Sequence, residues 1–162
     1  MLAPDQPAAP ATFSAAIRRY MSGCVAATCT TDAGERHIEL VDAFTSVSLD
    51  PPLVLLSVRA ERATVLQAAD PFQVHVLGVR HEELVRHLER AAHHADGEHA
   101  PVGIHVDVAG TALVTFGCRH FASYPTGDHV VLLGRVDTLQ VAAGEDSALA
   151  RMDGALARHP AP

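Results

Sequence analysis

Tryptophan is absent from the 162 residues, and aromatic side chains make up only 4% of them. Proteins that bind single-stranded nucleic acid usually stack the bases on aromatic rings, so this scarcity argues against such a surface. Hydrophobic residues are nevertheless abundant, at 48%, beside 19% charged residues. That balance is typical of a globular protein and excludes a disordered one. The core must therefore be built mainly from Val, Leu, Ile and Ala.

Long apolar runs and clustered positive charges are missing as well. No run approaches the roughly 20 residues of a membrane helix, and the opening MLAPDQPAAP lacks the build of a signal peptide. The 12 basic residues are scattered among 19 acidic ones, which gives a formal net charge of -7. A chain of this charge repels polyanions. We therefore expect a cytoplasmic protein that binds neither membranes nor nucleic acid.

Cysteine is sparse, with three residues, Cys24, Cys29 and Cys118. They lack the short paired spacing of a zinc site, so buried, reduced thiols are expected. Among 11 histidines, His93, His94 and His99 form a cluster in a polar segment that invites a metal interpretation. A metal site needs converging ligands with supporting groups behind them. This segment has no neighbouring cysteine, and we predict no metal site.

The apolar spacing predicts mostly strands, with a few helices between them. Helical spacing marks residues 12–21, with Thr12 as the cap, and residues 63–69 and 81–90. Strand patterns bounded by turn residues mark residues 24–31, 37–41, 44–49, 53–58, 72–77, 112–119, 121–124 and 129–139. Residues 93–103 are predicted to be a surface loop, and the Ala-rich residues 147–157 a helix.

Chain length and element order define the expected architecture. A chain of 162 residues corresponds to one domain, at about 100 to 200 residues each. The Pro- and Ala-rich residues 1–11 are expected to be a disordered tail, which leaves 12–162 as a single domain. The predicted strands do not alternate regularly with helices. We therefore predict a mainly β fold, an antiparallel barrel of about six or seven strands with helical additions.

Five ordered segments point to a known family. The run AFTSVSLDPPLVLLSV at residues 43–58 resembles the signature of the flavin reductase family, the FMN-binding split-barrel proteins. The opening helix ending in Ser22-Gly23 and the segments FQVHVL, TALVTFGC and GDHVVLLGRV follow the family's order and approximate spacing. Together they cover roughly residues 13–138. The resemblance implies that the antiparallel barrel is a split one.

The same resemblance implies an activity. Members of the family are NAD(P)H-dependent flavin reductases, so FMN or FAD is the expected flavin and NADH or NADPH the expected hydride donor. Hydride transfer between the two rings needs little from the protein beyond stacking them in contact. Members often serve as the reductase component of a two-component monooxygenase and form homodimers. A homodimer and a monooxygenase partner are therefore expected.

The resemblance also implies where the site lies. In the family, one loop before the signature segment and one after its apolar strand hold the flavin phosphate, and a Gly-Asp-His turn lies near the nicotinamide. Carried onto this chain, these positions predict a catalytic His129 and the cofactor-binding residues Leu40, Val41, Asp42, Ala43, Ser57, Arg59, Arg62, Ala63 and Thr64. The alternative for His129 is an inert, solvated turn residue.

The phosphate loops depart from the family pattern. Asp42 and Ala43 stand where relatives carry hydroxyl-bearing or neutral donors, and Arg62 and Ala63 replace serines. A carboxylate beside a phosphate repels it, so FMN is expected to bind weakly, as an exchangeable substrate. The alternative function is a divergent split-barrel protein that has lost ordinary FMN use. Such a protein would bind another planar cofactor, such as haem, or act as a biosynthetic enzyme on a ring-shaped substrate.

One further departure lies inside a predicted strand. His75 occupies the middle of the FQVHVL segment, where relatives usually carry Asn. A lone histidine in an apolar strand is more often a satisfied core residue than a ligand. We therefore predict that His75 is structural, with a hydrogen-bonding role left open.

Overall fold

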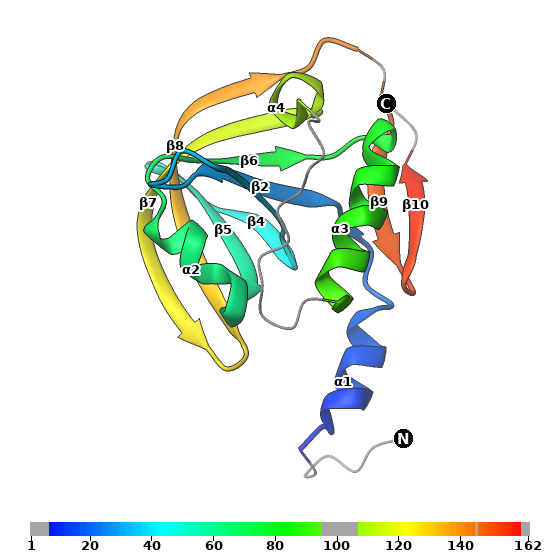
Figure 1. Ribbon diagram of the computed structural model, residues 1–162. Coiled ribbons are helices and arrows are strands. Elements are labelled where there is room, and N and C mark those ends of the chain that lie inside the picture. Colours follow the sequence, from blue (N-terminus) through cyan, green and yellow to red (C-terminus); the bar gives the residue numbers. More distant parts are fainter. Residues whose placement is uncertain (1–6, 95–106, 145, 160–162) are drawn as a thin grey trace.

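A computed structural model of the protein describes residues 7–94, 107–144 and 146–159 (Figure 1). Its elements in chain order are α1 (Pro10–Ile17), β1 (Ser22–Gly23), β2 (Val25–Thr30), β3 (Arg36–Leu40), β4 (Ala43–Leu49), β5 (Pro52–Arg59), α2 (Ala60–Ala68), β6 (Phe72–Val76), the 3-10 turn η1 (Val79–His81), α3 (Glu82–His94), α4 (Val108–Thr111), β7 (Val114–Thr126), β8 (His129–Val141), β9 (Ala148–Met152) and β10 (Ala155–His159).

Seven of these strands form one antiparallel sheet in the order β3-β2-β6-β7-β8-β5-β4. The strand predicted at residues 53–58 is β5, which lies between β8 and β4 and buries Val54, Leu56 and Val58. The long strands β7 and β8 curve around one side of the molecule (Figure 1). The prediction of a mainly β fold with helical additions is confirmed.

Two apolar clusters lie on opposite faces of this sheet. Strand β2 shows the division, because Val25 and Ala27 belong to one cluster and Cys24 and Ala26 to the other. Alternate residues of a strand point to opposite faces. Helix α2 packs on the first cluster, and α3, α4 and β9 contribute to the second. The helices therefore cover the sheet where its own apolar side chains emerge.

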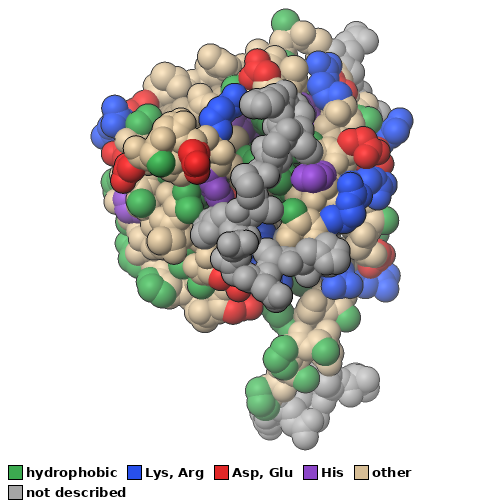
Figure 2. Space-filling model, viewed as in Figure 1, with side chains coloured by type: hydrophobic (Ala, Val, Ile, Leu, Met, Phe, Trp, Pro, Cys, Tyr) green, Lys and Arg blue, Asp and Glu red, His purple; other side chains and the backbone are tan. Residues whose placement is uncertain are grey.

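Helix α1 extends away from the body of the molecule and buries none of its residues (Figure 1). Figure 2 shows hydrophobic side chains gathered on it, and Phe13 and Ile17 are exposed. The prediction of a helix here is confirmed, but the predicted Thr12 cap is wrong. The helix begins at Pro10 after Ala9, and proline suits a first turn because its missing N–H needs no partner there. Residues 1–6 of the predicted tail lie outside the described residues.

The predicted helix at residues 147–157 is wrong. This segment is the β9–β10 hairpin, whose turn residues Asp153 and Gly154 have φ of 51° and 79°. Strand β9 also pairs with β1 and buries Leu149 and Ala150. Alanine favours helices, but this burial and pairing outweigh propensity. The Asp-Gly pair is the local signal for a two-residue hairpin turn.

The two strands predicted at residues 112–119 and 121–124 are a single strand, β7. Its pairing with β8 shifts register between His120 and Ala122. A bulge inserts one unpaired residue, so the side-chain alternation breaks at Phe121 and makes one strand look like two. The loop predicted from residue 93 starts inside α3, which ends at His94, and its remaining residues lie outside the described part. No helix within the described ranges is long and apolar enough to cross a membrane.

Candidate functional site

Three strand ends meet at one place in the large sheet. The pairing of β4 with β5 sets Ala43 opposite Ser57, and the pairing of β5 with β8 sets Arg59 opposite His129. Two backbone hydrogen bonds tie the adjoining residues together: Asp42 N–H donates to Ser57 O at 2.9 Å, and Ala60 N–H donates to Asp128 O at 3.0 Å. These contacts bring together three segments: the residues around the start of β4, the end of β5 and the start of β8.

His129 lies at the centre of this place, between two carboxylates. Its Nδ1 lies 2.7 Å from Asp128 Oδ1, and its Nε2 lies 3.6 Å from Asp42 Oδ2. An ionised carboxylate only accepts hydrogen bonds, so Nδ1 carries the proton it donates to Asp128. That bond holds the pKa of Asp128 below its usual value. With about a quarter of its side chain exposed, His129 can present Nε2 to a ligand.

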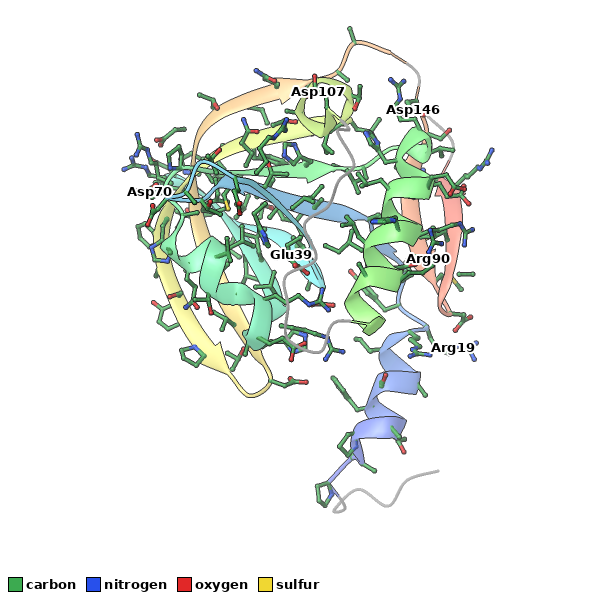
Figure 3. The ribbon with its side chains drawn as sticks, in the orientation of Figure 1. Arg19, Glu39, Asp70, Arg90, Asp107 and Asp146 are labelled. Atoms are coloured by element: carbon green, nitrogen blue, oxygen red, sulfur yellow. The ribbon has the colours of Figure 1, made fainter. Side chains whose placement is uncertain are left out.

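A second ion pair joins Arg62 of α2 to Glu39 of β3. Their Nη1 and Oε1 atoms are 2.6 Å apart, and Glu39 is buried. Figure 3 shows Glu39 near the centre of the molecule, whereas Asp70 and Arg90 lie at its periphery. Burial raises the pKa of Glu39, and Arg62 opposes that rise. Arg62 is thus paired with a buried carboxylate, a contact that no sequence pattern predicts.

The remaining predicted site residues divide into two groups. Val41 and Ala63 are buried in the first apolar cluster, and Leu40 packs against the second, so these three can offer a ligand only backbone atoms. The exposed or half-exposed group faces solvent: Asp42, Ala43, Ser57, Arg59 and Thr64. Arg59 is the last residue of β5 and lies close enough to Asp128 to help lower the pKa of Asp128.

His75 lies on a different part of the sheet, with no exposed surface. Its Nε2 is 2.8 Å from Thr28 Oγ1 and its Nδ1 is 3.1 Å from Thr115 Oγ1. Thr115 donates its own hydroxyl hydrogen to Ala109 O, so it accepts from His75 and the Nδ1 carries the proton. Both ring nitrogens are satisfied, and burial lowers the pKa of His75 to about 4. The prediction of a structural histidine agrees with this geometry.

The predicted histidine cluster lies partly outside the described residues, whereas the three cysteines lie within them. His93 and His94 end α3, and His99 lies outside the described residues. Among the residues that the structure covers, no three His, Cys, Asp or Glu side chains are placed to hold a metal. Cys24, Cys29 and Cys118 are buried and free, and burial raises the pKa of each thiol. They are packing residues, as expected.

Comparison with known proteins covers nearly the whole chain. The family model described as flavin reductase like domain matches residues 17–158. An NADH-dependent flavin reductase of Rhodococcus sp is 34% identical over 139 residues, 83% of this chain and 79% of the relative. The reductase component of 4-hydroxyphenylacetate 3-monooxygenase of Thermus thermophilus is 33% identical over 131 residues, 80% and 83% of the two chains.

A solved structure shares the fold. The styrene monooxygenase flavin reductase of Pseudomonas putida S12 superposes with a TM-score of 0.76 at 23% identity, over 93% of this chain and 98% of that one. The strand order, the meeting of the signature segment with the Gly-Asp-His turn, and the match along residues 17–158 agree with one another. The chain belongs to the flavin reductase like domain family.

Proposed function

We propose that this protein is an NADH-dependent flavin reductase that supplies reduced flavin to a flavin-dependent monooxygenase. The observation that carries the proposal is the meeting of His129, Asp42 and Arg59 at one end of the sheet, in a chain 34% identical to an NADH-dependent flavin reductase. A bound flavin would accept a hydride, with its two electrons, from the nicotinamide. The oxygenase partner is proposed because a relative is named as a monooxygenase reductase component.

The residues at this site fit the flavin ring better than its phosphate. Strand β4 is an edge strand of the sheet, so one side of its backbone is free of strand pairing within the described chain. Its exposed Thr45 and Ser46 add hydroxyl groups beside Asp42 and Ala43. Such a surface can hold a flat ring with several polar atoms, while His129 presents an imidazole nitrogen at its end. We assign His129 to orienting the nicotinamide or the reduced flavin.

The experiment is a steady-state assay of the purified chain. NADH or NADPH oxidation is followed with FMN, FAD and riboflavin added separately, and each rate is compared with that of the same mixture lacking flavin. We expect flavin-dependent oxidation that is faster with NADH. Oxidation that no added flavin accelerates would contradict the proposal.

The alternative of a haem protein gains no support from either His75 or His129. Both nitrogens of the buried His75 already have hydrogen-bond partners, and His129 lies outside both apolar clusters. An axial haem ligand needs a free ring nitrogen facing an apolar cavity. The ultraviolet-visible spectrum of the protein with added haemin tests this directly, and we expect no change in the Soret region.

We further propose that the protein is a cytoplasmic homodimer. The surface concerned is the outer face of β5 and β8, made by Leu53, Leu55, Val131 and Leu133 and here named the β5–β8 face. These residues alternate with the buried ones on the same strands and belong to neither apolar cluster. All four are half-buried, and a contiguous apolar patch that stays partly exposed is typical of an interaction surface. A symmetric pairing of two copies would cover it.

Light scattering coupled to size-exclusion chromatography tests the homodimer. The native protein should elute with twice the mass of the 17.1 kDa chain, and Leu55→Glu should shift it to the monomer. Met152→Glu, on the exposed end of β9, is the matched control and should leave the dimer intact. A native monomer at micromolar concentration would contradict the homodimer.

A further inference from the structure

Carboxylates outnumber guanidinium groups around the candidate site. Asp42 and Asp128 flank His129 at 3.6 and 2.7 Å. Asp42 and Glu61 both lie close enough to Glu39 to raise its pKa. Four carboxylates, those of Glu39, Asp42, Glu61 and Asp128, thus stand against two guanidinium groups, those of Arg59 and Arg62. The carboxylates at this place therefore outnumber the guanidinium groups by two.

Neither arginine reverses that balance. Arg62 is paired with Glu39, and turning it toward a ligand anion would leave a buried carboxylate without its partner. Removing one member of a buried pair is strongly unfavourable. Arg59 is exposed, and its charge already acts on Asp128. An anion arriving here would therefore meet uncompensated acidic side chains.

We propose that this site, taken as the flavin site of the proposed function, selects flavins by their uncharged ring and ribityl chain, and binds riboflavin more tightly than FMN. Asp42 and Glu61 are the residues that set this specificity. A phosphate monoester carries between one and a half and two negative charges at neutral pH, whereas riboflavin carries none. The two ligands share the same ring and chain, so the phosphate alone distinguishes them.

The size of the preference follows from Coulomb's law. One carboxylate at ~4 Å from a unit charge costs ~1 kcal/mol in water, which corresponds to about fivefold in affinity. Salt must shrink the preference, because the screening length falls from about 30 Å at 0.01 M to about 3 Å at 1 M. We expect riboflavin to bind at least about fivefold more tightly than FMN at low salt, and the two affinities to converge at high salt.

Quenching of flavin fluorescence measures both affinities without any turnover. Riboflavin and FMN are titrated with native protein and with the Asp42→Asn, Glu61→Gln double variant, at about 0.01 M and about 1 M salt. The double variant should bind FMN within about twofold of riboflavin at low salt. The matched control is Glu83→Gln, an exposed carboxylate in the first turn of α3, which should keep the native preference.

The possible outcomes separate this inference from the proposed function. If the native protein binds both flavins but prefers FMN at low salt, the inference is wrong and the reductase proposal stands. The inference also fails if Glu83→Gln tightens FMN binding as much as the double variant does. If neither flavin binds at any salt concentration, the proposed function fails, and this inference with it. Circular dichroism of each variant confirms that the fold is retained.

Discussion

Two histidines of this protein occupy opposite kinds of surroundings. His75 bridges three neighbouring strands through Thr28 and Thr115, has no exposed surface, and has both nitrogens satisfied by neutral hydroxyl groups. His129 begins β8 next to a hairpin turn, partly exposed, with a carboxylate on each side of its ring. Burial of the first ring lowers the pKa of His75, whereas the second ring lies partly exposed between two carboxylates.

The difference shows how this fold separates stability from chemistry. A residue inside the sheet is held by strands on both sides, so its hydrogen bonds are fixed and it is closed to ligands. A residue at a strand end keeps one side open, and its neighbours come from segments distant in sequence. His75 should therefore govern folding and His129 turnover. Three predictions test that division.

The largest expected effect is the loss of stability in acid caused by His75. Its pKa is about 4 in the folded protein, against 6.5 for an unperturbed histidine, so only the unfolded chain takes up this proton between those values. The contribution of His75 to the free energy of unfolding is complete above pH 6.5 and is lost as pH falls toward 4. A difference of 2.5 pKa units corresponds to about 3 kcal/mol in the free energy of unfolding.

Urea unfolding at pH 7 and at pH 4.5 measures this loss. His75→Asn removes the titrating group and keeps a hydrogen-bonding side chain in its place. Other groups with shifted pKa, such as His81 and Glu39, titrate in both proteins, so the difference between the two pH dependences isolates His75. If the free energy of unfolding depends on pH equally in native and variant protein, His75 takes up its proton in the folded protein without destabilising it.

The next effect is kinetic and concerns His129. His129→Ala should lower kcat/KM for NADH and flavin about tenfold, the loss of one hydrogen bond to a charged group at about 1.5 kcal/mol. The melting temperature should stay nearly unchanged, because the ring contacts two exposed carboxylates and lies outside both apolar clusters. Steady-state kinetics and thermal unfolding are measured on the same preparation.

His87→Ala, on α3 away from the site, is the control for replacing a partly exposed histidine. It should leave kcat/KM at the native value. A large fall in melting temperature for His129→Ala with unchanged kinetics would reverse the division, and the turn histidine would then be structural.

Most of the large sheet could be predicted because its signals are local. The run at residues 53–58 is apolar except for Ser57, and it forms most of β5, which begins at Pro52 and ends at Arg59. The C-terminal hairpin shows the limit of such reasoning. Its alanines favour a helix locally, whereas the Asp153-Gly154 turn and the pairing of β9 with β1, almost 130 residues earlier in the chain, make it two strands. Helix propensity summed along the segment does not include that long-range pairing.

The segments that meet at the candidate site could be named from the sequence, but their side-chain contacts could not. The resemblance to the family placed Asp42, Arg59 and His129 in separate segments, and strand register brings them together. The pair Arg62–Glu39 joins a helix to a strand 23 residues away. Neither segment carries a pattern that predicts this pair. Glu61 of α2 is exposed, whereas Ala63, two residues later in the same helix, is buried in the first apolar cluster. Side-chain direction on a short helix depends on what it packs against.

The smallest expected effect separates the orientation of the His129 ring from the direct part that His129 takes in turnover. Asp128 is almost fully exposed and reaches His129 from the β7–β8 turn, so Asp128→Ala should change kcat/KM by only about twofold to fivefold. The fall should appear in kcat, because the ring loses its fixed orientation while the flavin surface on β4 is untouched. Nitrogen-15 shifts of His129 report the same change directly, since Nδ1 loses the acceptor that keeps it protonated. Asp32→Ala, in the turn between β2 and β3, removes an equivalent exposed carboxylate at the far end of β3 and should alter neither reading. If Asp128→Ala leaves the His129 shifts at their native values, the carboxylate does not position the ring, and Asp42 alone must do so.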